Sequence, residues 1–155
     1  PAFSLDQVSA TEHTIQTGTY DPRARYSSDG RYFYLAENTS GVGFHRVYEL
    51  TIPGDVEGGK TLHSSTPNAV AHFSYVNNGT TAYGIINNAL NKWELTIPYD
   101  PNGGMKLLQT YPAFSTIDGA VQTAAYLWVS QDEQTIFVAE TVIPNPRVLQ
   151  YTLIP

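Results

Sequence analysis

The fold is decided by one short stretch that the chain repeats: Arg46-Val47-Tyr48-Glu49-Leu50-Thr51-Ile52-Pro53. It returns about 45 residues later as Asn91-Lys92-Trp93-Glu94-Leu95-Thr96-Ile97-Pro98, and more loosely as Arg147-Val148-Leu149-Gln150-Tyr151-Thr152-Leu153-Ile154-Pro155. The residues that follow also match at the first interval, since Gly54 to Leu62 corresponds to Tyr99 to Leu107. Two matched blocks at one interval indicate a repeat architecture.

Each copy is preceded by a turn signal and then by a run of aromatic and β-branched residues. Asp-Gly and Asn-Gly supply the positive φ that a tight hairpin needs, and the residues after them fit a pleated, half-buried surface. The turns and runs are Asp29-Gly30 with 31–37, Asn78-Gly79 with 80–86, and Asp132-Glu133 with 134–140. In the third copy Glu133 replaces glycine, which leaves its turn geometry open.

A complete module has four predicted strands. The first precedes the turn (24–27, 72–76, 126–130), the second follows it, the Glu-Leu-Thr-Ile stretch is the third, and 60–64 or 105–110 is the fourth. We therefore expect an all-β, β-propeller-like fold of three four-stranded antiparallel modules within one domain, 1–155, with repeats near 24–65, 70–110 and 124–155. Ten prolines and twelve glycines interrupt every candidate helix, so helix content should be close to none.

The third module lacks a fourth strand in this pattern. Glu12 to Thr17 resembles the fourth strands of the other modules, so we predict that it pairs with the third module, in its own chain or in a neighbouring copy. Three modules are fewer than the roughly 4 to 8 blades that close a ring. A longer chain, a ring completed by several copies, and an open stack of modules are the alternatives.

Composition limits the classes of partner. Eight Lys and Arg face fourteen Asp and Glu, for a net charge of −6 without a basic cluster, which argues against nucleic acid as a partner. No stretch approaches the roughly 20 apolar residues of a membrane helix, so we expect no membrane partner. The absence of cysteine excludes thiolate catalysis and thiolate metal sites. We expect no cofactor.

The repeat resembles one found in tailed-phage and marine-virus structural proteins. The matching residues are Ser28-Asp29-Gly30-Arg31-Tyr32-Phe33-Tyr34-Leu35, then Val47-Tyr48-Glu49-Leu50, then Pro98-Tyr99-Asp100. The Asp-Gly hairpin is also similar to YncE-type and lactonase-type seven-bladed propellers. The resemblance implies a propeller fold with a virion or extracellular location, and it transfers no catalytic residue.

Several polar residues are candidate metal ligands. His13, His45, His63 and His72 lack metal-ligand spacing, so structural roles are expected and no metal site is predicted. Asp55 and Asp100, each before a Gly-Gly pair, are expected to cap turns rather than bind calcium, because each loop offers only one or two carboxylates.

The sequence shows no recognisable set of catalytic residues. Glu37 and Glu140 end equivalent strands, where a lactonase-type propeller would hold a channel metal. Asn87 breaks this pattern in the second module, so we interpret the two glutamates as solvated carboxylates. There is no nucleophile elbow, phosphate loop or dinucleotide-binding glycine motif. We expect no enzymatic activity, and a lactonase-like hydrolase is the weakest hypothesis.

Two aromatic residues are the candidate binding residues. Tyr48 and Trp93 occupy equivalent places, where packing between modules is expected and a shallow sugar platform is the alternative. Asn38 and Asn78 match the N-glycosylation acceptor, both in expected loops. The sequence favours a structural protein that self-associates as a virion component or extracellular fibre subunit, with a carbohydrate-binding lectin-type module, and hence glycan partners, as the alternative.

Overall fold

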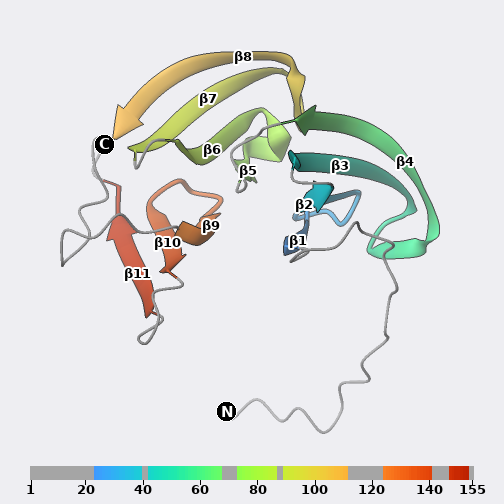
Figure 1. Ribbon diagram of the computed structural model, residues 1–155, viewed down its shortest axis with the longest axis horizontal. Coiled ribbons are helices and arrows are strands. Elements are labelled where there is room, and N and C mark those ends of the chain that lie inside the picture. Colours follow the sequence, from blue (N-terminus) through green and yellow to red (C-terminus); the bar gives the residue numbers. More distant parts are fainter. Residues whose placement is uncertain are drawn as a thin grey trace, which may run out of the picture.

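Three antiparallel sheets make up the computed structural model, which describes residues 23–39, 42–67, 73–86, 89–111, 124–140 and 147–153 (Figure 1). We call them blades 1, 2 and 3. Blade 1 holds β1 (Arg23–Tyr26), β2 (Tyr32–Thr39), β3 (Val42–Ile52) and β4 (Asp55–Pro67). Blade 2 holds β5 (Phe73–Val76), β6 (Thr81–Ile86), β7 (Ala89–Ile97) and β8 (Asp100–Tyr111). Blade 3 holds β9 (Ala124–Val129), β10 (Thr135–Glu140) and β11 (Arg147–Thr152).

Each sheet is a meander in which every strand pairs with its neighbour in the chain. The blades lie side by side in an arc, with β1, β5 and β9 inside and β4 and β8 outside (Figure 1). The only helical element of the described residues is the short 3-10 turn Asn77–Gly79. This confirms the predicted all-β, propeller-like class. The predicted strand Glu12 to Thr17 lies outside the described residues and stays a prediction.

The fourth strands begin earlier than their sequence predicts, at Asp55 and Asp100 rather than near residues 60 and 105. Each Gly-Gly pair therefore lies within a strand, beside an irregularity in its pairing with the third strand. Gly59 and Gly104 have φ of +114° and +121°, which an L side chain rarely adopts. The chain thus bends at these glycines without leaving the sheet.

An aromatic cluster joins blades 1 and 2. Tyr34 and Val47 of blade 1 pack against Ala82, Trp93 and other residues of blade 2. The ring of Tyr32 stacks on Tyr99, with centroids 4.3 Å apart. Aromatic side chains bury large apolar areas and pair at defined geometries. This cluster therefore holds the two sheets face to face.

An aliphatic cluster joins blades 2 and 3. It contains seven fully buried side chains: Val76, Tyr83, Leu90, Leu127, Val129, Ile136 and Val138. The backbone amide of Val129 also donates to the hydroxyl oxygen of Ser74, 3.0 Å away. In both interfaces, one face of a blade meets the opposite face of the next.

One expected loop residue lies in a strand. Asn38 belongs to β2 and is in register with Gly43 of β3. The reason is that the hairpin is tight, because Thr39 and Val42 still pair and the strands extend almost to its tip. Asn78, in contrast, is exposed in the turn before β6, with φ of +52°.

Candidate functional site

The turn that leads into β10 has the same internal bonding as the turn into β2. In blade 1, Ser27 donates to Asp29, which also accepts from the backbone amide of Arg31. In blade 3, Ser130 donates to Asp132, which also accepts from the backbone amide of Gln134. The turn geometry left open by the sequence is therefore retained in the third copy, although glutamate stands in place of glycine.

Glu133 adopts a backbone conformation that normally favours glycine. Its φ is +57°, while Gly30 and Gly79 at the equivalent positions have φ of +70° and +81°. A non-glycine residue in this region destabilises the folded state by about 1–2 kcal/mol. The contacts of the Glu133 side chain must therefore offset a backbone strain that glycine would not have.

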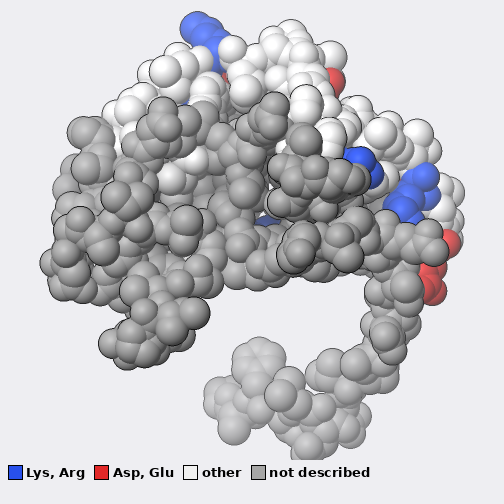
Figure 2. Space-filling model, in the orientation of Figure 1, with Lys and Arg blue, Asp and Glu red and all other residues white. Residues whose placement is uncertain are grey.

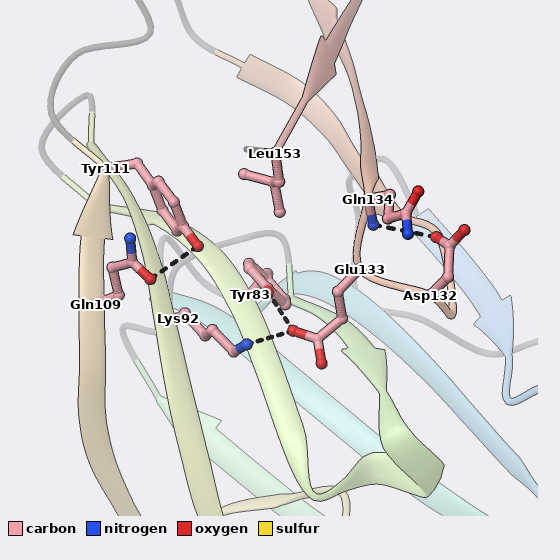
Figure 3. Close-up of a pocket in the computed structure, with 8 residues that line it drawn as sticks. All are labelled: Tyr83, Lys92, Gln109, Tyr111, Asp132, Glu133, Gln134 and Leu153. Atoms are coloured by element: carbon pink, nitrogen blue, oxygen red, sulfur yellow. Dashed lines mark hydrogen bonds and ion pairs between the residues drawn. The ribbon is translucent and has the colours of Figure 1, made fainter. Parts of the chain in front are cut away.

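That side chain connects blade 3 to blade 2. The Glu133 carboxylate lies 2.5 Å from the ammonium nitrogen of Lys92 and accepts from the amide nitrogen of Asn77 at 2.6 Å. It also accepts from the hydroxyl of Tyr83. Asn77 precedes β6, Tyr83 lies on β6 and Lys92 on β7, so a single carboxylate satisfies three donors from the neighbouring blade. Figure 3 shows the contacts with Tyr83 and Lys92.

The electrostatics follow from this geometry. Burial acts to raise the pKa of Glu133, but hydrogen bonds from Lys92, Tyr83 and Asn77 outweigh it, and the pKa of the carboxyl lies below its ordinary value. Burial and the bond to Glu133 raise the pKa of Tyr83 well above that of a free phenol. At neutral pH the cluster is thus an ionised carboxylate held by an ammonium and a neutral phenol.

A pocket of about 340 Å³ opens beside this cluster. Figure 3 shows side chains converging on it from blade 2 on one side and blade 3 on the other. The lining residues are Tyr83, Lys92, Gln109, Tyr111, Asp132, Glu133, Gln134 and Leu153. The pocket combines an ion pair, a second carboxylate, two phenols, two amides and one aliphatic side chain.

The other candidate surface is the face of blade 3 that carries Trp128. Cross-strand register places Trp128, Phe137 and Gln150 in one row, with Val148 two residues along on the same face. The Trp128 and Phe137 rings lie 5.3 Å apart. Trp128 is 45% exposed and Val148 is 66% exposed.

The corresponding rows of the other blades are covered. In blade 1 the row contains Tyr34 and Val47, and Val47 is fully buried against blade 2. In blade 2 it contains Ser74 and Tyr83, and Tyr83 is fully buried against blade 3. This face is therefore buried by the next sheet in blades 1 and 2, whereas in blade 3 it carries an exposed aromatic side chain.

The predicted aromatic pair has different environments. Trp93 is only 6% exposed, within the cluster between blades 1 and 2, which confirms the packing expected of it. Tyr48 is half-buried against the core of blade 1, which holds Phe33 and Leu35. A sugar-binding role for Tyr48 and Trp93 stays a prediction.

The two aspartates that were predicted to cap turns both lie in the described residues. Asp55 accepts from the backbone amides of Glu57 and Gly58, both at 2.9 Å, and Asp100 from that of Asn102 at 3.0 Å, so both acids cap local turns as expected.

Two of the four histidines lie at contacts between blades 1 and 2. A ring nitrogen of His45 lies 2.8 Å from the Tyr75 hydroxyl, and one of His63 lies 3.0 Å from the Pro98 carbonyl oxygen. His13 and His72 fall outside the described residues, as do the side chains of Glu37, Glu140 and Asn38.

Sequence reasoning missed Glu133 and Trp128 as candidate functional residues. For Glu133 the signal was present, because a glutamate at a position that requires glycine elsewhere in the repeat must compensate for backbone strain. For Trp128 no local signal exists, since exposure depends on what covers the sheet.

Comparisons with known proteins add little at the level of function. No protein-family model matches the sequence, and no curated protein matches it. Similar solved structures include the following two. The β-propeller domain of Cps50 (Swd1) from Myceliophteria thermophila aligns with 84% of this chain and 37% of its own, at 11% identity and a TM-score of 0.49. The periplasmic gluconolactonase PpgL of Pseudomonas aeruginosa aligns with 81% and 38%, at 13% identity and a TM-score of 0.47.

The chain therefore spans well under half the length of both structures. Because unrelated functions share such folds, the activity of neither protein is transferred to this chain.

On the face in Figure 2, the described Lys and Arg side chains lie at separate points, and most of the other described residues are uncharged. Within the described ranges, no three His, Cys, Asp or Glu side chains gather as a metal site would require. No helix in this part of the chain is long and apolar enough to cross a membrane.

Proposed function

We propose that this protein is a non-enzymatic assembly module in which the Trp128 face of blade 3 binds the same face of a second copy. The observation that carries the proposal is the exposure of Trp128 and Val148 on a face that another sheet covers in blades 1 and 2. A role as a virion component or extracellular fibre subunit would use such a contact.

The chemistry of the face suits a contact between sheets. Both interfaces within the chain join this face of one blade to the opposite face of the next, so in blades 1 and 2 this face already packs against a sheet. A partly exposed tryptophan in contact with a phenylalanine is the kind of anchor that dominates binding energy at interfaces.

A second copy is the partner that the charges favour. The described side chains of this face are uncharged: Trp128, Thr135, Phe137, Ala139, Val148, Gln150 and Thr152. Two identical faces can therefore meet about a twofold axis without repulsion between like charges. This distinguishes the face from most of an acidic protein's surface.

The test is the molar mass in solution. We expect light scattering after size exclusion to give a mass that rises with concentration toward a dimer or larger species, and Trp128→Ser to return the monomer. Leu62→Ser is the matched control, because Leu62 is 53% exposed on β4 of blade 1 and should leave the association unchanged.

Two results would overturn the proposal. One is a monomer at every concentration. The other is an oligomer whose mass is the same for Trp128→Ser as for the unaltered protein, which would move the contact to a different surface.

A further inference from the structure

The pocket between blades 2 and 3 has the size of a small-molecule site. Its volume of about 340 Å³ lies near the lower end of the roughly 300–1,000 Å³ that such sites occupy. Tyr111 of blade 2 and Leu153 and Glu133 of blade 3 line it (Figure 3). A ligand here would touch two blades at once.

Lys92, the cation among the described lining residues, is already paired with a carboxylate. Lys92 pairs with Glu133, which also accepts from Tyr83. Asp132 accepts from the Ser130 hydroxyl and from the backbone amide of Gln134. Asp132 has no cation partner among the described residues, so the pocket presents one unpaired carboxylate and no unpaired cation, which disfavours a phosphate. Two carboxylates are too few for a metal site, and a neutral ligand with hydroxyl donors fits this lining better.

The remaining polar capacity suits hydroxyl groups. The Tyr111 hydroxyl donates to the Gln109 side-chain oxygen at 3.0 Å. This leaves the Tyr111 oxygen as an acceptor beside the amide nitrogen of Gln109, which has no hydrogen-bond partner among the described residues and carries two donor hydrogens. A hydroxyl group both donates and accepts, so neighbouring hydroxyls on one molecule match this pair.

The apolar part of the lining suits the C–H groups of such a molecule. The ring of Tyr111 and the side chain of Leu153 border the pocket above the ion pair (Figure 3). A tyrosine presents an apolar ring with a polar tip, which is the combination that a ligand with both C–H and O–H groups requires. A sugar has both kinds of group.

We propose that this pocket binds a neutral monosaccharide or short oligosaccharide, with Gln109 and Tyr111 bonding its hydroxyls and the Tyr111 ring contacting its carbon face. The site differs from the aromatic pair Tyr48 and Trp93, and it does not depend on self-association. The strained turn at Glu133 supports this site, because the Glu133 carboxylate holds the side chains of Lys92 and Tyr83 in place along the pocket.

The test is a titration of the full chain with a panel of neutral hexoses and N-acetylhexosamines, followed by protein-observed NMR. We expect at least one sugar to shift the side-chain amide signal of Gln109. Gln109→Ala should weaken binding about fivefold or more, as the loss of a hydrogen bond does. Gln109 is exposed, so this variant should fold.

Further variants separate contact from folding. Tyr111→Phe removes only the hydroxyl and should also weaken binding, while Tyr26→Ala, at a 41% exposed tyrosine of blade 1, should leave it unchanged. The proposal is overturned if no sugar binds, if Gln109→Ala binds as tightly as the unaltered protein, or if residues 12–17 are found to fill the pocket. The first two results would leave the oligomeric state, and thus the assembly proposal, unaffected.

Discussion

The carboxylate of Glu133 on blade 3 lies 2.5 Å from the ammonium group of Lys92 on blade 2. Their side chains are 20% and 24% exposed, so the pair is mostly withdrawn from water. Removing one partner of such a pair leaves the other poorly solvated, and the cost exceeds that of a surface ion pair. One side chain in a strained turn thus adds an ion pair to the apolar cluster that joins blades 2 and 3.

Substitution of Glu133 separates backbone strain from side-chain bonding. Both Glu133→Ala and Glu133→Gly lose the bonds to Asn77, Tyr83 and Lys92, so both should be less stable than the unaltered protein by about 1–3 kcal/mol. Because φ is +57°, the glycine variant should be more stable than the alanine variant by about 1 kcal/mol. Urea unfolding of the three proteins measures both differences, and equal stability of the two variants would contradict the strain.

The Glu133 contact should weaken in acid. The folded pKa lies below the unfolded value of about 4.3, so the stabilisation is complete above that value and is lost as the pH falls through the folded pKa. Melting temperatures of the unaltered protein and of Glu133→Gln, measured from pH 7 to about pH 3, should therefore converge on acidification. A constant gap between the two curves would show that the charge contributes nothing.

Tyr99 should destabilise the fold in strong alkali. Burial, with a smaller effect of the Asp29 charge, raises the pKa of Tyr99 to about 12. The unfolded phenol ionises near pH 10, so the stabilisation is complete below about pH 10 and declines as the pH rises toward 12. Tyr99→Phe keeps the ring that stacks on Tyr32 and should show a smaller decline. Alkaline unfolding followed by circular dichroism compares the two.

Gly79 should not tolerate a side chain. Its φ is +81°, and a Cβ would lie 2.3 Å from ring atoms of Tyr99. Gly79→Ala should cost about 2–4 kcal/mol through backbone strain and overpacking. Gly43→Ala is the control, because a Cβ there meets nothing within 4 Å, and it should change the free energy of unfolding by less than about 1 kcal/mol. Equal effects of the two substitutions would contradict the packing at Tyr99.

The chain's two tryptophans should differ sharply. Trp93 is buried between blades 1 and 2, so Trp93→Ala should cost about 3–5 kcal/mol. Trp128 is 45% exposed, so Trp128→Ala should cost much less in dilute solution, where any association is absent. Thermal unfolding at low protein concentration tests this, and an unchanged melting temperature for Trp93→Ala would place that ring on the surface.

Short-range patterns were sufficient to predict the modules. The repeat around Glu49 and Glu94 gives the strand order, and the turns at Gly30 and Gly79 have the positive φ that their sequence predicts. These features depend on neighbours in the chain, because alternation of side chains and turn chemistry act over a few residues. The start of β4 was less predictable, since Gly58 and Gly59 normally mark loops but here lie inside a strand.

The sequence by itself determined an all-β chain of repeated antiparallel modules, but it left open the geometry of the turn at Glu133. Only the tertiary structure decided that this carboxylate meets Lys92 and Tyr83, that Trp93 is buried and that Trp128 is exposed. The reason is that hydrogen bonding and side-chain alternation define a sheet locally, whereas the packing of one sheet on the next brings together residues far apart in the chain.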